Sequence, residues 1–296
     1  MAAPPQANLA AVVVLYFPPQ EVYEQISRLA EMCHWVLVVD NTPGALDPTM
    51  IELAGRSPEI AYLPQGRNAG ISVALNTGVR EALVREAEWV LLLDQDSVVP
   101  DAYLSRLQET LQAYPEASRI GVICPTLGEI DQGHRAWQIV PLAITSGSLI
   151  RTCLFETCGW FNEDLFIDYV DFDYCLRLRA VGWLVLMATQ ARLEHRIGDP
   201  ISLPTPFGRI RTLNHPPIRR YYKFRNRIHM LKTYLFRHPA WMIKELLSGA
   251  LEVAKSMLVE PSKAAKLAMI LRGTLDALRG RTGAAPSGLD VARVGR

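Results

Sequence analysis

The stretch from Glu88 to Pro100, EWVLLLDQDSVVP, contains four apolar residues, Val90 to Leu93, followed by the carboxylates of Asp94 and Asp96. A short apolar run of this kind is typical of a buried strand. Carboxylates at the carboxyl end of such a strand lie where open α/β sheets bind ligands. The pair suits Mg²⁺, which takes one or two carboxylates and completes its shell with water and substrate phosphates. The stretch therefore indicates metal-assisted chemistry on a phosphorylated substrate, although an Asp-rich turn would give the same pattern.

Strand-like and helix-like patterns alternate on the N-terminal side of this stretch. Apolar runs predict three earlier strands, at 9–17, 35–39 and 60–63. Apolar residues at helical spacing predict helices at 19–32 and 71–87. This alternation favours an α/β fold with a mostly parallel sheet and helices on both faces.

The pattern becomes less regular after residue 115. We expect further strands at 120–124, within 139–150 and at 183–187, and a helix at 171–179. The five prolines within 199–217 predict a loop.

The chemistry of the chain changes at residue 219. Residues 219–237 carry seven Lys or Arg and five aromatic residues without a single acid. Apolar residues at helical spacing then predict two amphipathic helices, at 240–258 and about 263–279. The last residues, 281–296, are rich in Gly, Ala and Arg, a composition that predicts a disordered tail.

Acids and bases are unevenly distributed, although the net charge is only +1. Residues 1–115 hold 14 acids and 6 bases, whereas residues 116–296 hold 16 acids and 25 bases. The basic second half indicates a polyanionic partner, such as phosphates, a membrane surface or nucleic acid, or else a solvated basic face.

Cysteine spacing and hydropathy disfavour other classes of protein. The five cysteines include no C-x-x-C pair, which favours a reducing compartment over a disulfide framework or a zinc site. The apolar stretch 9–17 follows no basic segment, so it is interpreted as a first strand and not as a signal peptide. No run approaches 18 apolar residues, so no transmembrane helix is expected.

Polar side chains follow the ends of the predicted strands. Asp40 follows the second strand, Arg67 and Asn68 the third, and Asp94 and Asp96 the fourth. Because the carboxyl ends of such strands converge, these side chains are expected to line one crevice.

A second acidic group lies downstream, in LFIDYVDFDYCLR. Its carboxylates, Asp168, Asp171 and Asp173, are close enough for their pKa values to be pushed apart, which is one route to a general base. His195 follows a predicted strand and is interpreted either as a structural residue or as a ligand.

Together these features resemble the inverting glycosyltransferases of family 2, which have the GT-A fold, and among them the bacterial rhamnosyltransferases. The motifs run in order from residue 12 to residue 226: VVVLYFPP, VVDNT, RNAGISVALNTGV, LLLDQDS, ITSGSLI, GWFNEDLFIDYVDFDYCLR and RRYYKFRN. Each motif is weak alone, but together they are specific for the family. The resemblance implies a Rossmann-like, mostly parallel central sheet flanked by helices, with a helical C-terminal extension.

The resemblance also implies a division of the chain into three parts. A GT-A catalytic domain would cover 1–218, with a nucleotide-sugar half at about 1–115 and an acceptor half at about 116–218. The basic aromatic segment and the amphipathic helices would form a second part at 219–280, followed by the tail at 281–296.

Each motif receives an implied role from this resemblance. Asp171 would be the general base that deprotonates the acceptor hydroxyl, while Asp96 and His195 would hold a metal on the donor diphosphate. The residues implied to bind the donor are Tyr16, Asp40, Arg67, Asn68, Asp94, Arg220, Tyr222, Arg225 and Asn226. Those implied to bind the acceptor are Gly147, Ser148, Trp160 and Asp168. Arg177 is expected to be a structural or pocket-ordering partner of the neighbouring acids.

Two positions depart from the pattern of the family. Tyr16-Phe17-Pro18 stands where members often have Tyr-Asn-Pro, which alters the local contacts near the base. Val170-Asp171 stands where many members have Glu-Asp, a variant that is common in the rhamnosyl branch.

The implied partners are those of cell-surface polysaccharide synthesis. The donor would be dTDP-β-L-rhamnose, the metal Mg²⁺ or Mn²⁺, and the acceptor a saccharide that is often lipid-linked. The protein would be cytoplasmic, peripheral on the inner face of the plasma membrane, with no nucleic-acid partner. The C-terminal helices would lie on that membrane or pack on protein, including a second subunit.

Three alternative hypotheses compete with this interpretation. A UDP-sugar donor would keep the fold and the mechanism. A phosphatase of the haloacid dehalogenase type needs a lysine before its second acidic pair, whereas the first lysine here is Lys223, which follows Asp171 and Asp173. A noncatalytic adaptor for membranes or polyanions would use the basic half but leaves the acidic residues unexplained.

Overall fold

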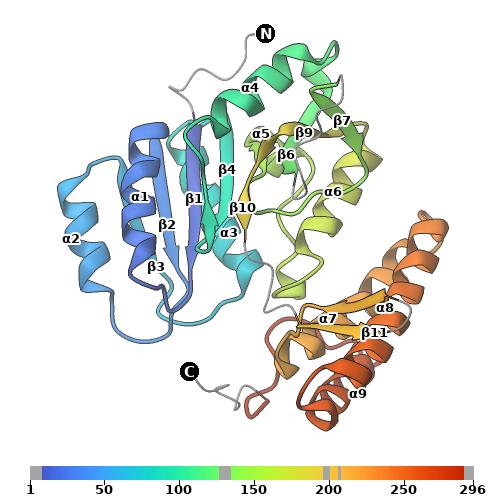
Figure 1. Cartoon of the computed structure of the whole chain (residues 1–296). Coiled ribbons are helices and arrows are strands. Elements are labelled where there is room, and N and C mark those ends of the chain that lie inside the picture. Colours follow the sequence, from blue (N-terminus) through green and yellow to red (C-terminus); the bar gives the residue numbers. More distant parts are fainter. Residues whose placement is uncertain (1–8, 127–134, 196–200, 206–207, 290–296) are drawn as a thin grey trace. The chain divides into compact units, whose positions relative to one another are not determined.

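A computed structural model of the chain (Figure 1) describes residues 9–126, 135–195, 201–205 and 208–289. The chain forms two compact units. Unit 1 comprises residues up to Asn162 together with Val170–His195, and unit 2 comprises Glu163–Tyr169 together with the residues after His195. The chain thus passes into unit 2 after His195, whereas the sequence predicts a division after residue 218.

Unit 1 is built on an eight-stranded sheet with the strand order β3-β2-β1-β4-β8-β6-β9-β7. Its strands are β1 (Leu9–Leu15), β2 (Trp35–Asp40), β3 (Ile60–Pro64), β4 (Trp89–Asp94), β6 (Ile120–Thr126), β7 (Trp137–Val140), β8 (Leu149–Arg151) and β9 (Leu184–Arg192). β1 to β4 are mutually parallel, β6 and β9 are parallel, and β8 and β7 run antiparallel to their neighbours. The mostly parallel sheet predicted from the sequence is confirmed.

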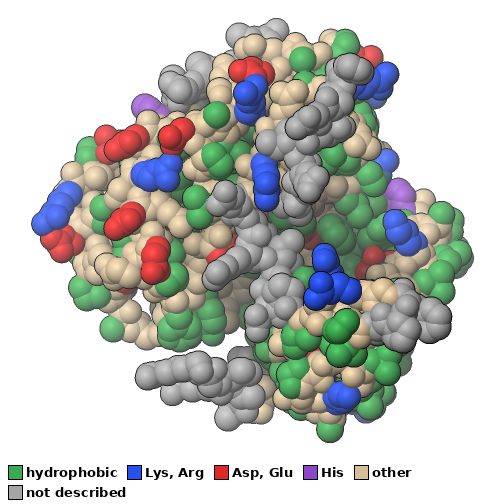
Figure 2. Space-filling model, viewed as in Figure 1, with side chains coloured by type: hydrophobic (Ala, Val, Ile, Leu, Met, Phe, Trp, Pro, Cys, Tyr) green, Lys and Arg blue, Asp and Glu red, His purple; other side chains and the backbone are tan. Residues whose placement is uncertain are grey.

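Helices cover both faces of this sheet (Figure 1). They are α1 (Glu21–Met32), α2 (Pro48–Arg56), α3 (Ile71–Val84), α4 (Tyr103–Ala113), α5 (Cys153–Thr157) and α6 (Val170–Ala180). Successive residues of a strand point to opposite faces, so a strand covered on both faces is apolar throughout. In β1, Val13 belongs to the core cluster that contains Ile26 of α1, while Val12 meets Gly78 of α3 on the other face. Figure 2 shows carboxylates gathered over the part of unit 1 formed by α1 and α2.

Unit 2 contains a two-stranded hairpin and three helices. The hairpin is β11 (Ile201–Thr205) paired with β12 (Gly208–Thr212), and the helices are α7 (Pro217–Tyr234), α8 (Pro239–Val259) and α9 (Lys263–Leu278). The helical C-terminal region is therefore confirmed. None of the described helices is long and apolar enough to cross a membrane.

Two sequence predictions for this region need correction. The loop predicted at 199–217 is wrong for its described residues, because most of them form the β11–β12 hairpin and α7 begins at Pro217. Both strands of an isolated hairpin are edge strands, which tolerate a proline such as Pro204. The predicted tail is also partly ordered: the backbone of Gly283 and of Ala285 is hydrogen-bonded to Asp164 and to Tyr222. Residues 290–296 lie outside the described residues.

We expect Gly78→Ala to lower the free energy of unfolding by about 1–3 kcal/mol, the usual cost of overpacking a filled core. A Cβ at this position would lie 2.4 Å from Cγ1 of Val12, so β1 and α3 would have to separate. Urea unfolding would measure the change. Gly55→Ala in α2 is the matched control, because a Cβ there meets nothing within 4 Å. Adding Val12→Ala to Gly78→Ala should restore part of the loss, and no restoration would contradict this account.

Candidate active site

The ends of three parallel strands bring two of the predicted site residues together in unit 1. In the strand register, Leu15 at the end of β1 lies opposite Asp40 of β2, and Val14 lies opposite Asp94 of β4. Neighbouring strands are about 4.8 Å apart, so the backbones of the two acids are separated by roughly 10 Å. Because Leu15 and Val14 are successive residues, the two side chains start on opposite faces of the sheet, so a ligand that contacts both must lie across the ends of the strands.

Asp40 is almost completely buried, at 4% exposure, and both of its carboxylate oxygens accept hydrogen bonds. One oxygen accepts from the backbone N–H of Thr42 at 2.9 Å, and the other accepts from the hydroxyl of Tyr62 at 2.7 Å. Burial, together with this bond to Asp40, raises the pKa of Tyr62 to about 12, so the phenol remains a donor. A carboxylate oxygen has a second lone pair, so Asp40 can still accept one more hydrogen bond from a ligand.

The chain leaves β1 through two exposed aromatic residues, Tyr16 and Phe17. The side-chain amide of Gln95 accepts a hydrogen bond from Tyr16 N at 2.7 Å and donates one to Tyr16 O at 3.1 Å. Phe17 N donates to the hydroxyl of Thr42 at 2.9 Å. The turn after β1 is therefore tied both to the segment after β4 and to the segment after β2. Neither Gln95 nor Thr42 was predicted from the sequence.

A pair of asparagines fixes the loop that carries Arg67 and Asn68. The amide of Asn41 donates to Asn68 Oδ1 at 3.2 Å, and Asn41 Oδ1 accepts from Ala69 N at 2.9 Å. Asn68 Oδ1 also accepts from the N–H of Gly70, the residue before α3. Arg67 is exposed on this fixed loop, whereas Asn68 is half-buried and takes part in the structure of the loop. The role of Asn41 was missed, although Asn directly after a strand is a known turn-forming signal.

The D-x-D segment is anchored by serines. Asp94 N donates to the hydroxyl of Ser146 at 3.2 Å, and this hydroxyl lies 2.5 Å from that of Ser97. Asp94 is half-buried and Asp96 is exposed. Ser97 begins the short strand β5 (Ser97–Val98), which pairs with β10 (Glu194–His195) so that His195 lies opposite Ser97. The backbone of Asp96, the residue before Ser97, therefore lies close to the backbone of His195.

The donor set at this point is suited to a hard divalent ion. Within the described part of the chain, no three His, Cys, Asp or Glu side chains form a group that could hold a metal ion. Mg²⁺ needs only one or two protein carboxylates when waters and substrate phosphates complete its shell. Asp94 and Asp96 supply ligands of that type, and their role toward a metal stays a prediction.

Gly147 and Ser148 are buried where the segment before β8 meets β4. Gly147 N donates to Leu92 O at 2.7 Å, and Leu92 N donates to Ser148 O at 3.0 Å. Gly147 has φ +79°, and a Cβ there would lie 2.7 Å from the hydroxyl of Tyr103, so this position requires glycine. These contacts give both residues a structural function, while their predicted contact with an acceptor stays a prediction.

The second acidic group divides into an accessible acid and a structural acid. Asp171 lies in the first turn of α6 and is half-buried, with one oxygen accepting from Phe172 N at 2.9 Å. Asp173 is 5% exposed and forms an ion pair with Arg177 at 2.9 Å, which confirms Arg177 as a structural partner. Arg177 also donates to the carbonyl oxygens of Cys158 and Trp160, at 2.7 and 2.8 Å. It thereby holds the loop on which the partly exposed ring of Trp160 lies.

Four predicted donor-binding residues lie on α7 in unit 2, where their side chains are buried and have intramolecular partners. Arg220 pairs with Glu252 and, at 2.7 Å, with Glu260. The hydroxyl of Tyr222 accepts from Ala285 N at 2.8 Å. The other two residues, Arg225 and Asn226, have backbone carbonyl oxygens of loop 163–169 among their partners.

Loop 163–169 has a strained backbone that α7 holds in place. Phe166, Asp168 and Tyr169 have φ values of +62°, +63° and +68°, a region that costs non-glycine residues about 1–3 kcal/mol each. The amide of Asn226 donates to the carbonyl oxygens of Leu165, Ile167 and Asp168, at 2.7, 2.7 and 3.0 Å.

Side chains of the same loop are also held by α7. The carboxylate of Asp168 pairs with Arg219 at 3.2 Å, and the ring of Phe166 stacks on Tyr222 with centroids 4.7 Å apart. The loop ends at Tyr169, and α6 begins at the next residue. Buried α7 side chains therefore determine the conformation of the chain just before Asp171, and their predicted contact with a donor stays a prediction.

The family and the relatives to which this chain is similar are all glycosyltransferases by their names. Residues 11–175, more than half of the chain, match the family described as Glycosyl transferase family 2. The dTDP-rhamnosyl transferase RfbF of Shigella flexneri is 27% identical over 308 residues, covering 94% of this chain and 97% of that protein. The galactofuranosyltransferase GlfT1 of Mycobacterium tuberculosis is 26% identical over 253 residues, covering 76% of this chain and 82% of that protein.

Two solved structures share the fold at low sequence identity. GalNAc-T7, crystallised with UDP, GalNAc and Mn²⁺, has a TM-score of 0.54 at 12% identity, covering 64% of this chain and 43% of that chain. Residues 1–349 of TarS from S. aureus have a TM-score of 0.50 at 13% identity, covering 92% of this chain and 72% of that chain. These similarities support the fold class that the sequence predicts.

We expect Asn226→Ala to lower the free energy of unfolding by about 1–3 kcal/mol, because the carbonyl oxygens of Ile167 and Asp168 lose the donor that Asn226 supplies. Thr233→Ala, an exposed polar position on the same helix, is the matched control. Urea unfolding measures the stability of both variants. Calorimetry on the folded variant then separates the two roles of Asn226: unchanged nucleotide affinity supports a role in holding the loop, and a loss above tenfold supports direct contact with a donor.

Proposed function

The chain belongs to glycosyl transferase family 2, and we propose that it transfers L-rhamnose from dTDP-β-L-rhamnose to a saccharide acceptor, with inversion at the anomeric carbon. The observation that carries this proposal is the register that sets Asp40 and Asp94 on either side of the end of β1. Both acids lie within the part of the chain that matches the family. Support for the sugar comes from the relative named dTDP-rhamnosyl transferase, which aligns with nearly the whole chain.

The donor is proposed to lie along the strand ends. Asp40 accepts the ring N–H of the base, and the exposed rings of Tyr16 and Phe17 are available to stack on it. Asp94 approaches the ribose, while Arg67 and Asn68 lie toward the diphosphate. Base recognition through a buried carboxylate is selective, because a ligand without the matching N–H would leave that carboxylate with an unused acceptor.

Asp171 is proposed to act as the general base. Its carboxylate takes the proton of the acceptor hydroxyl while that oxygen attacks the anomeric carbon from the face opposite the diphosphate. The bond between the anomeric carbon and the diphosphate oxygen breaks, and the sugar is transferred with inverted configuration. Trp160, Gly147, Ser148 and Asp168 are the residues proposed for the acceptor side.

Asp96 and His195 are the residues proposed to hold Mg²⁺ or Mn²⁺. Such an ion, when bound, supplies positive charge for the departing nucleoside diphosphate. Asp96 belongs to a segment whose backbone is fixed by Ser146 and by pairing with β10, the strand that carries His195, so both positions would need little rearrangement on binding.

The acceptor is proposed to be a lipid-linked saccharide, with the protein peripheral on the cytoplasmic face of the membrane. Support comes from unit 2, where 12 of the 16 Lys or Arg within residues 208–289 are not buried, against 2 of the 4 Asp or Glu. A basic surface of this kind is attracted to anionic lipids.

We expect Asp171→Asn to lower kcat by about 10² to 10⁴-fold, the usual contribution of a positioned general base. Nucleotide affinity should stay unchanged, because Asp171 is assigned to the acceptor and not to the donor. Initial rates of transfer and calorimetry would measure the two quantities. Asp101→Asn is the control, because this acid is exposed and paired only with Arg28 among the described residues. A variant with unchanged kcat would remove Asp171 from this role.

A nucleotide panel tests the donor and the metal together. We expect dTDP and dTDP-rhamnose to bind more tightly than UDP, GDP or CDP, with an affinity that depends on added Mg²⁺. Asp96→Ala should abolish the dependence on Mg²⁺, because it removes a proposed ligand. Calorimetry measures each pair. Preference for UDP would keep the mechanism and reject rhamnose as the sugar, whereas no binding of any nucleotide would reject a catalytic role and favour an adaptor.

A further inference from the structure

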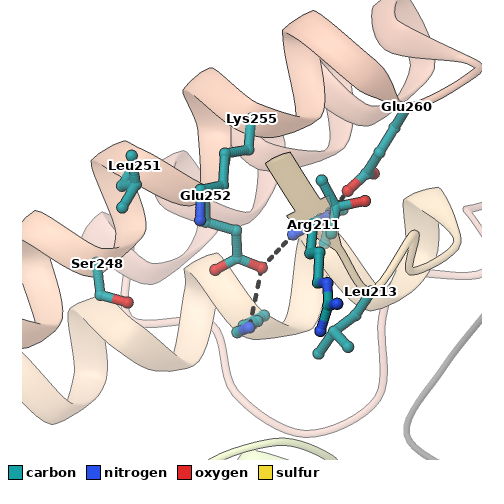
Figure 3. Close-up of a pocket in the computed structure, with 10 residues that line it drawn as sticks. Arg211, Leu213, Ser248, Leu251, Glu252, Lys255 and Glu260 are labelled. Atoms are coloured by element: carbon teal, nitrogen blue, oxygen red, sulfur yellow. Dashed lines mark hydrogen bonds and ion pairs between the residues drawn. The ribbon is translucent and has the colours of Figure 1, made fainter. Parts of the chain in front are cut away.

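Unit 2 contains a pocket of about 200 Å³ between α7, α8 and β12 (Figure 3). Its lining includes four cations and two carboxylates: Arg211, Arg220, Lys223, Lys255, Glu252 and Glu260. The labelled residues in Figure 3 show that β12 and the segment after it supply one side of the pocket and α8 the other. The described lining therefore carries more positive than negative charge.

The two carboxylates are already neutralised within unit 2. Glu260 pairs with Arg220 and Lys266, both at 2.7 Å. Burial alone would raise the pKa of Glu260, but hydrogen bonds from Lys266 and Arg220 outweigh it and lower the pKa to about 2. Glu252 is paired with Lys223 at 2.9 Å, with Arg227 at 3.1 Å and with Arg220. Both acids are thus anionic and engaged with cations of their own.

The remaining cations of the pocket have capacity for an added anion. Arg211 and Lys255 form no ion pair with any residue that the structure describes. Arg220 is 2% exposed, and its Nε has no hydrogen-bond partner among the described residues. That atom is itself buried, so the capacity for an added anion lies with Arg211 and Lys255. The pocket is therefore complementary to a phosphate group.

Apolar side chains surround this cationic pocket. Leu213 and Leu251 belong to its lining and are 40% and 55% exposed. Along α8, Leu247 and Leu258 are 67% and 64% exposed, at spacings of four and seven residues from Leu251. These spacings place the three leucines on one face of the helix. Figure 2 likewise shows hydrophobic and cationic side chains side by side on the surface of unit 2.

We propose that this pocket binds the phosphate headgroup of an anionic membrane lipid, while the exposed leucines of α8 enter the acyl layer beside it. Charge complementarity supports a lipid surface as the occupant, because 12 bases and 2 acids within residues 208–289 are not buried. In this arrangement α8 lies along the membrane surface, with its exposed leucines toward the acyl layer. This inference rests on the proposed membrane location, but it is independent of the nucleotide and the sugar.

Vesicle co-sedimentation with the full-length protein tests the proposal. We expect binding to vesicles of phosphatidylcholine with phosphatidylglycerol, and at least tenfold weaker binding to phosphatidylcholine alone. Arg211→Glu combined with Lys255→Glu should weaken binding to the anionic vesicles by more than tenfold. The control pair, Arg237→Glu with Lys244→Glu, makes the same change in net charge outside the pocket and should weaken binding less than threefold. Equal losses in both pairs would overturn a specific pocket in favour of general attraction.

A second double variant tests the contribution of the exposed leucines of α8 to vesicle binding. Leu247→Ser combined with Leu251→Ser keeps every charge, and we expect it to weaken vesicle binding by about tenfold. If these changes instead convert a dimer into a monomer, measured by light scattering, while vesicle binding is unchanged, the face is a contact between two copies and the proposal is wrong. Tight binding of inorganic phosphate without vesicle binding would also overturn it. Nucleotide affinity is measured separately, without lipid. If nucleotide still binds when vesicles do not, this inference fails and the proposed transferase function stands.

Discussion

The hydrogen-bonded register of β2, β1 and β4 is the constraint on which the candidate site depends. β1 carries no functional side chain, but both Asp40 and Asp94 are placed by their pairing with it. A slip of one residue would turn every side chain of a strand to the other face of the sheet. Such a slip is opposed on both faces, where Val13 packs toward α1 and Val12 packs against Gly78 of α3. The positions of Asp40 and Asp94 at the polar edge of the sheet are therefore fixed by the apolar packing of β1.

The sequence predicts this half of the molecule well because its determinants are local. A strand buried on both faces has a continuous apolar sequence. The acids at the ends of such strands can therefore be identified once the apolar runs are found. The Asn41–Asn68 and Gln95–Tyr16 contacts could not be found in this way, since they join residues 27 and 79 positions apart. The β11–β12 hairpin was missed because its prolines are typical of loops, and an isolated two-stranded pair tolerates them.

The basic segment of α7 shows a different limit of prediction. A run of Arg, Lys and aromatic residues without acids indicates a binding surface, yet Arg220, Arg225 and Asn226 are all at most 2% exposed. Their partners are carbonyl oxygens and glutamates far away in the sequence, and no local sequence pattern predicts these contacts. Unit 2 thus buries charge while α8 exposes leucines, the reverse of the usual distribution in a globular protein. A buried ionic network gains little net stability. In unit 2 it joins α7 to α8, because Glu252 pairs with both Arg220 and Arg227.

The path of the chain between the two units limits how this protein can be divided. It crosses from one unit to the other after Asn162, after Tyr169 and after His195. A fragment that stopped at His195 would retain loop 163–169 but lose the Asn226 amide that holds its carbonyl oxygens. The C-terminal helices are consequently not an interchangeable module. In a chimaera with a relative, loop and helices must come from the same parent, so the unit of exchange is discontinuous in sequence.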